Sequence, residues 1–185
     1  MSTAGPSQGA RPPWGRRRAA PLRGGSLNGP AANAALITRF YAAFARRDAA
    51  GMIACYHAQV SFSDPVFTAL DARGVATMWR MLCERGKDLA IVASDIAADD
   101  ATGHAHWVAD YTFSGTGRHV TNRIDATFEF RDGLIARHVD RFSLWRWAGM
   151  ALGAKGLLLG WLPPVRTAIR AQAAHALAAY AARPA

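Results

Sequence analysis

The sequence predicts an α+β fold in which three helices precede a run of antiparallel strands and further helices follow. Apolar residues recur at helical spacing in the first part of the chain, whereas from Leu89 onward they alternate with polar ones, as in strands with one buried face. With 185 residues, 51% of them hydrophobic, the chain can bury a core without disulfides or structural metal.

The helices are placed by their apolar faces. The first face consists of Ile37, Phe40, Tyr41 and Phe44, at positions i, i+3, i+4 and i+7. Asp48 is suited to cap a second, short helix that carries Met52, Ile53 and Tyr56. After a short strand over residues 60–63, Gly74 precedes a third helix, whose apolar face is Val75, Met78, Trp79 and Leu82.

Four further strands are predicted from alternation and turn residues, over residues 89–97, 103–113, 120–130 and 134–142. In the third of these, Asn122, Ile124, Ala126 and Phe128 share the apolar face, and Asp125 lies on the other. In the last, His138, Asp140 and Phe142 share one face, opposite Ile135 and Val139.

Two tails flank this body. Residues 1–30 hold five arginines, no acidic residue and many prolines and glycines, which predicts a disordered basic arm. This arm accounts for five of the nine net positive charges, and without a basic stripe on a folded face we expect no nucleic-acid partner. Residues 145–185 are predicted to form an apolar helical extension, too short in its apolar run to span a bilayer, that packs on the body or makes peripheral contact with a membrane.

Cys55 and Cys83 are too few for a disulfide framework and lack partners at zinc-ligand spacing. We therefore expect a reducing, cytoplasmic location and no metal site.

Three segments at matching separations carry a family resemblance: "RFYAAFARRDAAGMIACYHAQVSFSDP", "RGVATMWRML" and "FEFRDGLIARHVDRF". Residues 31–144 thereby resemble the nuclear transport factor 2-like superfamily, which includes ketosteroid isomerases, SnoaL-like polyketide cyclases and limonene epoxide hydrolases. The resemblance implies a cone-shaped fold of three N-terminal helices packed in a curved antiparallel sheet. It further implies an apolar ligand pocket, a homodimer and chemistry without a cofactor.

The resemblance also suggests site residues. Asp64, in "FSDP", matches the aspartate that shuttles a proton in ketosteroid isomerases, although Asp-Pro is also an ordinary turn. The isomerase tyrosine that donates to the dienolate oxygen falls at Phe40, with Tyr41 one residue away. The second oxyanion donor falls at Asp125 by one alignment and at Ala126 by the other, and the apolar face favours Ala126.

Asp140 is the strongest candidate, because epoxide hydrolases and polyketide cyclases of this superfamily carry an acid–base aspartate on the last strand. His138 shares its face and can join a proton network or be a buried structural histidine. The epoxide hydrolases also need Arg-x-Asp on an earlier strand. Near that place stands Asp110, preceded by Val108 and opposite the apolar face, which argues against that reaction.

Seven further residues are expected to line the ligand pocket: Phe40, Tyr41, Tyr56, Trp79, Trp107, Tyr111 and Asn122, the last beside Asp140. The sequence therefore predicts cofactor-free isomerase- or cyclase-type acid–base chemistry on an apolar carbonyl or polyketide-like ligand through Asp140, with Asp64 and His138 as helpers. The alternative is a non-catalytic ligand-binding or dimerisation module whose polar groups satisfy one another.

Overall fold

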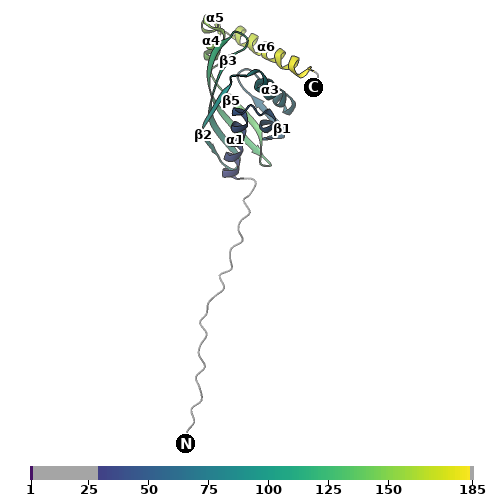
Figure 1. Ribbon diagram of the computed structural model, residues 1–185, viewed down its shortest axis with the longest axis vertical. Helices are drawn as coiled ribbons and strands as arrows, with labels where there is room; N and C mark the ends of the chain where they lie inside the picture. Colours follow the sequence, from purple (N-terminus) through teal and green to yellow (C-terminus); the bar gives the residue numbers. More distant parts are fainter. Residues whose placement is uncertain (2–28, 184–185) are drawn as a thin grey trace.

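The computed structural model describes Met1 and residues 29–183. Residues 2–28 of the predicted basic arm over residues 1–30 lie outside the described residues. The division of the chain into domains at residues 30 and 144 stays a prediction. The α+β fold is confirmed: a curved five-stranded sheet holds helices in its hollow, and a helical extension follows it (Figure 1).

The three predicted N-terminal helices are present as α1 (Pro30–Ala45), α2 (Ala49–Ile53) and α3 (Ala72–Arg85). The Asp48 side chain caps α2 as expected, accepting a hydrogen bond from the Gly51 N–H at 2.8 Å. Asp71 caps α3 in the same way through the Gly74 N–H, so α3 begins two residues before Gly74 rather than after it.

The strands are β1 (Tyr56–Ser63), β2 (Ala90–Ala98), β3 (Thr102–Phe113), β4 (Arg118–Arg131) and β5 (Leu134–Arg141), in the order β1-β5-β4-β3-β2. Strands β2 to β5 pair antiparallel, as predicted, whereas β1 pairs parallel with β5. Tyr56 opens β1 instead of ending α2, which corrects the sequence prediction and places its side chain on the sheet.

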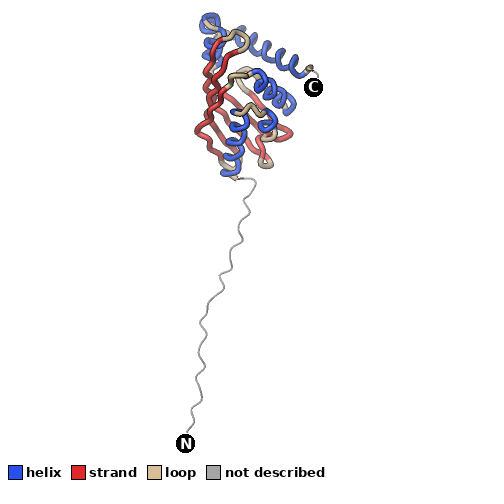
Figure 2. Tube along the Cα trace, viewed as in Figure 1, coloured by secondary structure: helices blue, strands red, loops and turns tan. Residues whose placement is uncertain are grey.

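The core lies between the helices and the concave face of the sheet (Figure 2). Its largest side chains with less than 2% exposure include Phe40 of α1, Trp79 of α3, Phe62 of β1 and Phe128 of β4. Burying one such side chain stabilises the fold by about 1.5–3 kcal/mol. Together these aromatic rings form the dry surroundings of the polar groups described below.

The alternation in β4 is confirmed: Ile124, Ala126 and Phe128 are buried, while the Asp125 side chain is 79% exposed. In β5, His138 and Asp140 point inward as predicted. Ile135 was expected on the opposite face, but it too is fully buried. The reason is a register shift between Glu129 and Phe130: Phe130 pairs with Ile135, whereas Phe128 pairs with His138.

The C-terminal extension consists of α4 (Leu144–Leu152), α5 (Ala154–Leu159) and α6 (Pro163–Ala181). Helix α4 packs on β4, and α6 runs along α3. Arg170 of α6 donates from Nε to the Pro65 carbonyl at 2.9 Å, and Tyr180 donates to Glu84 of α3 at 2.6 Å. Of the two placements left open by the sequence, α6 therefore adopts packing on the body. Within residues 29–183, no helix combines the length and the apolar character needed to cross a membrane.

Candidate functional site

Four buried side chains from three elements form one chain of hydrogen bonds. Trp79 Nε1 of α3 donates to the Tyr56 hydroxyl of β1 at 3.1 Å, and this hydroxyl lies 2.7 Å from His138 Nδ1 of β5. His138 Nε2 lies 3.1 Å from Asp140 Oδ1 on the same strand. His138 is fully buried and the Asp140 side chain is 4% exposed, so the chain of bonds is shielded from water.

The chemistry of the donors sets the direction of these bonds. An indole N–H can only donate, so the Tyr56 oxygen accepts from Trp79 and its own proton is free for His138 Nδ1. A neutral His138 that accepts at Nδ1 carries its proton on Nε2, from which it donates to Asp140. The imidazole is thus held with its Nε2 proton aimed at the carboxylate.

Asp140 receives a second donor from β3. Trp107 Nε1 lies 3.2 Å from Asp140 Oδ1, the same oxygen that faces His138. In residues 29–183, both hydrogen bonds to this carboxylate therefore go to Oδ1, and Oδ2 receives none. Two fixed donors on one oxygen hold the carboxylate plane in one orientation.

Tyr41 of α1 carries the one buried side-chain polar atom without a hydrogen-bond partner among the described residues. Its ring lies 5.9 Å from that of Trp107, which itself binds Asp140. Burial, and next the charge of Asp140, raise the pKa of Tyr41 well above its ordinary value, so its hydroxyl stays protonated. A buried hydroxyl without a partner costs about 1–3 kcal/mol, so the exception at Tyr41 requires an explanation.

Asp64 lies beyond the end of β1, where its carboxylate accepts from the Val66 and Phe67 backbone N–H groups. Burial is the main cause that raises the pKa of Asp64 to about 6, against an ordinary 3.8, and the Asp140 charge adds to it while the two backbone donors oppose it. Asp64 makes the turn that Asp-Pro predicted, and it also feels the charges of Asp140 and His138, while its catalytic role stays a prediction.

This raised pKa predicts a pH-dependent stability. Between about pH 4 and pH 6 the folded protein keeps a proton on Asp64 that the unfolded chain releases, so the free energy of unfolding falls as pH rises through this window. Asp64→Asn removes this pH dependence. We therefore expect the free energy of unfolding of Asp64→Asn, compared with that of wild type, to rise by about 1–3 kcal/mol between about pH 4 and pH 6.

Urea unfolding of both proteins across this pH range measures the difference. Asp125→Asn, the same change at a side chain that is 79% exposed, controls for the loss of one charge. A difference between Asp64→Asn and wild type that stays constant with pH would contradict the raised pKa.

Some predicted site residues lie elsewhere. Asn122 was expected beside Asp140, but Asp140 pairs with Ala126, four residues or about 13 Å along β4. Tyr111 accepts a hydrogen bond from Trp147 of α4 at 2.9 Å, so it joins the sheet to the extension rather than to Asp140. Asp125 and Asp110 both face outward, where they bond to His106 and His119, as their positions in the alternation predicted.

Five other predicted residues lie around the pair His138 and Asp140, although a ligand pocket lined by them stays a prediction: Phe40, Tyr41, Tyr56, Trp79 and Trp107. The Phe40 ring lies 5.6 Å from the His138 ring. Sequence reasoning missed Phe62 and Phe128, whose ring centroids lie 5.1 and 4.4 Å from that of His138. The alternation in β4 carried a signal for Phe128, because it places this residue on the buried face, whereas its pairing with His138 depends on the register shift between Glu129 and Phe130.

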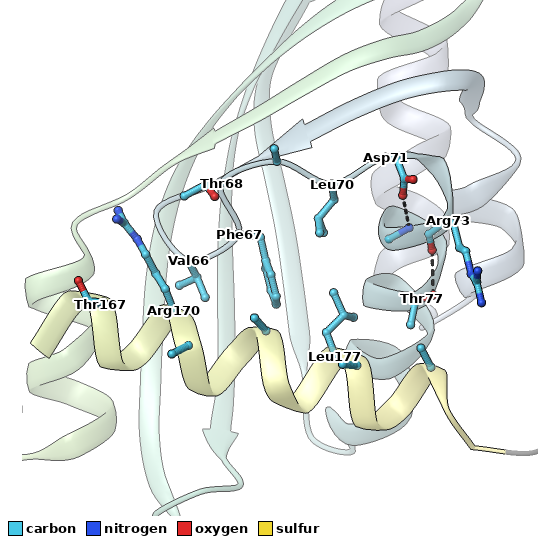
Figure 3. A pocket seen from close by; sticks show the side chains of 16 residues that line it. Val66, Phe67, Thr68, Leu70, Asp71, Arg73, Thr77, Thr167, Arg170 and Leu177 are labelled. Carbon is cyan, nitrogen blue, oxygen red and sulfur yellow. Dashed lines mark hydrogen bonds between the residues drawn. The ribbon is translucent and has the colours of Figure 1, made fainter. Parts of the chain in front are cut away.

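Two hollows lie outside this cluster. One, of about 620 Å³, runs between α6 and the segment 66–74, and it is lined mainly by alanine, leucine, threonine and Phe67 side chains (Figure 3). The other, of about 590 Å³, lies along β2 to β5 and is lined by outward-facing side chains such as Glu129 and Arg137. Neither is lined by His138 or Asp140, so the chemical argument rests on the buried hydrogen bonds. Within the described residues, no three His, Cys, Asp or Glu side chains are grouped so that they could hold a metal ion.

The wall of the first hollow is nevertheless linked to Asp64. Val66 and Phe67 line this hollow, and their backbone N–H groups hold the Asp64 carboxylate. Phe67, Leu70 and Leu177 of α6 are partly buried and pack against the core. Segment 66–70 and α6 therefore cover this side of the core.

Comparisons with known proteins agree with this architecture. The sequence model of the SnoaL-like domain matches residues 37–138. An LEH-like epoxide hydrolase of M. tuberculosis is 19% identical, with a TM-score of 0.55 over 72% of this chain and 98% of its own. A candidate polyketide cyclase from Xanthomonas campestris pv. campestris is 21% identical, with a TM-score of 0.53 over 68% and 99%.

A third solved structure, that of TerC co-crystallised with polyporic acid, is 17% identical, with a TM-score of 0.58 over 65% of this chain and 98% of its own. Likeness at these identities establishes the fold alone. No curated protein matches the chain.

Proposed function

The chain belongs to the SnoaL-like domain family, and from that premise we propose that it binds a small apolar carbonyl compound and moves a proton on it without a cofactor. The observation that carries this proposal is the buried carboxylate of Asp140, oriented by His138 and Trp107, beside the unpartnered hydroxyl of Tyr41. The polyketide cyclase, epoxide hydrolase and polyporic acid named for solved relatives fit a family that handles such ligands.

The proposed reaction begins with the ligand's carbonyl oxygen at the Tyr41 hydroxyl. Asp140 Oδ2 takes a proton from the carbon next to this carbonyl, and the C–H electron pair forms an enolate. The Tyr41 O–H, which burial keeps protonated, donates to the enolate oxygen and stabilises its charge. Asp140 then returns the proton to another carbon, which isomerises the ligand, or the enolate carbon attacks a second carbonyl, which closes a ring.

His138 and Asp64 act as helpers in this scheme. The Nε2 proton of His138 stabilises the Asp140 carboxylate before the reaction and holds it in place while Oδ2 carries the proton. Asp64, with a pKa of about 6, is partly protonated near neutral pH and can supply a proton to a second carbonyl that becomes a hydroxyl. Tyr56 and Trp79 position the imidazole.

A panel of ligands tests this proposal through thermal stability. We expect one carbonyl class among steroid enones, aromatic polyketides and fatty acids to raise the melting temperature of the wild type, with terpene epoxides as the non-carbonyl comparison. Tyr41→Phe should reduce this shift, because the ligand's oxygen loses its donor.

Tyr41→Phe is also expected to leave the free protein as stable as wild type or more stable by about 1 kcal/mol, because it removes a buried polar atom without a partner. Tyr111→Phe is the matched control: its hydroxyl accepts from Trp147, so its loss should destabilise the protein. Urea unfolding of both variants measures the difference.

Two outcomes would count against the proposal. If no ligand class stabilises the wild type, the dimerisation module becomes the better interpretation. If Tyr41→Phe destabilises the protein as much as Tyr111→Phe does, the Tyr41 hydroxyl has a partner of its own and is not the ligand's donor. The homodimer implied by the family resemblance stays a prediction, which sedimentation velocity measures directly.

A further inference from the structure

Helix α5 presents its glycines to the protein and its leucines to the outside. Gly156 and Gly160 are buried, whereas Leu157, Leu158 and Leu159 are 54%, 67% and 47% exposed. An amphipathic helix on a globular protein normally shows the reverse arrangement. This inversion requires a structural cause and leaves an apolar surface without a partner.

The cause is a very close approach of α5 to α4. A Cβ atom added at Gly156 would stand 1.9 Å from the Ala148 carbonyl oxygen of α4, and one at Gly160, which ends α5, would stand 3.0 Å from the Ala148 Cβ atom. Only glycine allows this contact, so the three leucines are forced outward. Leu157, Leu158 and Leu159 are therefore held at the surface by the fold itself.

Two tryptophans extend the same surface. Trp145 is 43% exposed and donates from Nε1 to the Leu157 carbonyl at 2.8 Å. Trp161 is 63% exposed and donates to the Leu158 carbonyl at 3.0 Å. Their polar N–H groups are satisfied by the backbone, which leaves the rings as exposed apolar surface. We call these five residues the apolar tip: Trp145, Leu157, Leu158, Leu159 and Trp161.

The charged side chains of the C-terminal extension, which carries the apolar tip, have one sign. Residues 144–185 contain no aspartate or glutamate, but they contain Arg146, Lys155, Arg166, Arg170 and Arg183. Arg170 and Arg183 are bonded to the body, whereas Arg146, Lys155 and Arg166 are exposed on α4, α5 and the start of α6. These three segments lie together at the end of the molecule opposite the start of α1 (Figure 1).

We propose that the apolar tip docks into the surface of an anionic lipid bilayer, with the leucine and tryptophan side chains in the boundary region and the three basic side chains at the headgroups. Leucine and tryptophan beside lysine and arginine are the composition that binds this interface. A second copy of the chain is a poorer occupant, because a two-fold contact would set the same positive charges against one another. This proposal does not depend on the reaction proposed above.

Co-sedimentation of the full-length chain with vesicles tests the proposal. We expect binding to vesicles made of equal parts phosphatidylcholine and phosphatidylglycerol. Binding to phosphatidylcholine alone should be weaker by about tenfold or more, because each basic residue near an anionic surface adds to the free energy of binding. Leu158→Glu should weaken binding to the anionic vesicles by about tenfold or more, since it replaces buried apolar contact by a repelled charge.

The control must allow for the five arginines before residue 29, which also attract anionic lipid. Val92→Glu makes the same change of charge at a side chain that is 68% exposed on β2, and it keeps these arginines. We expect it to bind nearly as well as the wild type. Leu158→Ser, which leaves the net charge unchanged, should weaken binding as well, and the melting temperature of each variant confirms its fold.

Equal binding by Leu158→Glu and Val92→Glu would overturn the proposal, because the arginines alone would then account for the attraction. Absence of binding by the wild type would also overturn it. A dimer in sedimentation velocity that Leu158→Glu dissociates, without vesicle binding, would assign the apolar tip to a second copy instead.

Discussion

Asp140→Asn is expected to lower the turnover of the stabilising carbonyl ligand by a factor of roughly 10² to 10⁴, the usual contribution of a general acid–base group. The asparagine oxygen still accepts from Trp107 Nε1 and His138 Nε2 at the position of Oδ1. The amide nitrogen replaces Oδ2 and carries no free lone pair for a proton. The fold and the hydrogen bonds survive, while the base is lost.

The measurement is the rate of product formation by wild type and variant, with the free energy of unfolding as the check on folding. Asp125→Asn makes the same chemical change on β4 at an exposed side chain and should leave turnover unchanged. Full activity in Asp140→Asn would sink the assignment of Asp140 as the base. Equal losses in both variants would point to an effect of net charge instead.

The inward position of this carboxylate could be predicted because the evidence for it is local. Alternation along β4 places Phe128 inside and Asp125 outside, and alternation along β5 places His138 and Asp140 on one face. One register shift was not visible in the sequence. This shift inserts one extra residue into β5 between Ile135 and Arg137, so Ile135 is buried on the same side as His138.

The rest of the site could not be predicted because it depends on contacts between distant elements. Nothing near Tyr56 in sequence shows that its hydroxyl meets Trp79 of α3 and His138 of β5. Asn122 belongs to the predicted face of β4 but lies too far along the strand from Asp140, since alternation gives the side of a strand and not the distance along it. Likewise, the exposure of Leu158 follows from the contact of Gly156 with Ala148, which only the packed helices reveal.

The position that the family resemblance assigns to the isomerase tyrosine shows how contacts between distant elements matter for function. Sequence alignment placed Phe40 there and Tyr41 one residue away. In the structure both side chains are buried, because a helix face that packs inside a cone is wide enough for two adjacent positions. Phe40 lies against the His138 ring, while Tyr41 lies against Trp107. The departure from the family pattern therefore leaves a hydroxyl near Asp140 rather than removing it.

Phe40→Ala is expected to cause the largest loss of stability of any single truncation considered for this site, about 3–5 kcal/mol. Phe40 is fully buried, and its ring centroid lies between 5.1 and 6.4 Å from those of five other rings: Tyr41, Phe44, Tyr56, Trp79 and His138. Truncation to alanine removes all of these contacts at once. The surrounding side chains belong to α1, α3, β1 and β5, so they cannot close the cavity together.

Urea unfolding of Phe40→Ala measures this loss, and Phe113→Ala is the matched control. Phe113 stands at the end of β3, is only partly buried and packs against one ring, that of Trp147 at 5.3 Å, so its truncation should cost clearly less. Equal losses would mean that the rings around His138 repack freely. In that case the orientation of the imidazole toward Asp140 would not depend on the aromatic cluster, and Phe40→Ala should keep its turnover. If turnover is retained while stability falls strongly, the Phe40 ring stabilises the core but does not orient His138.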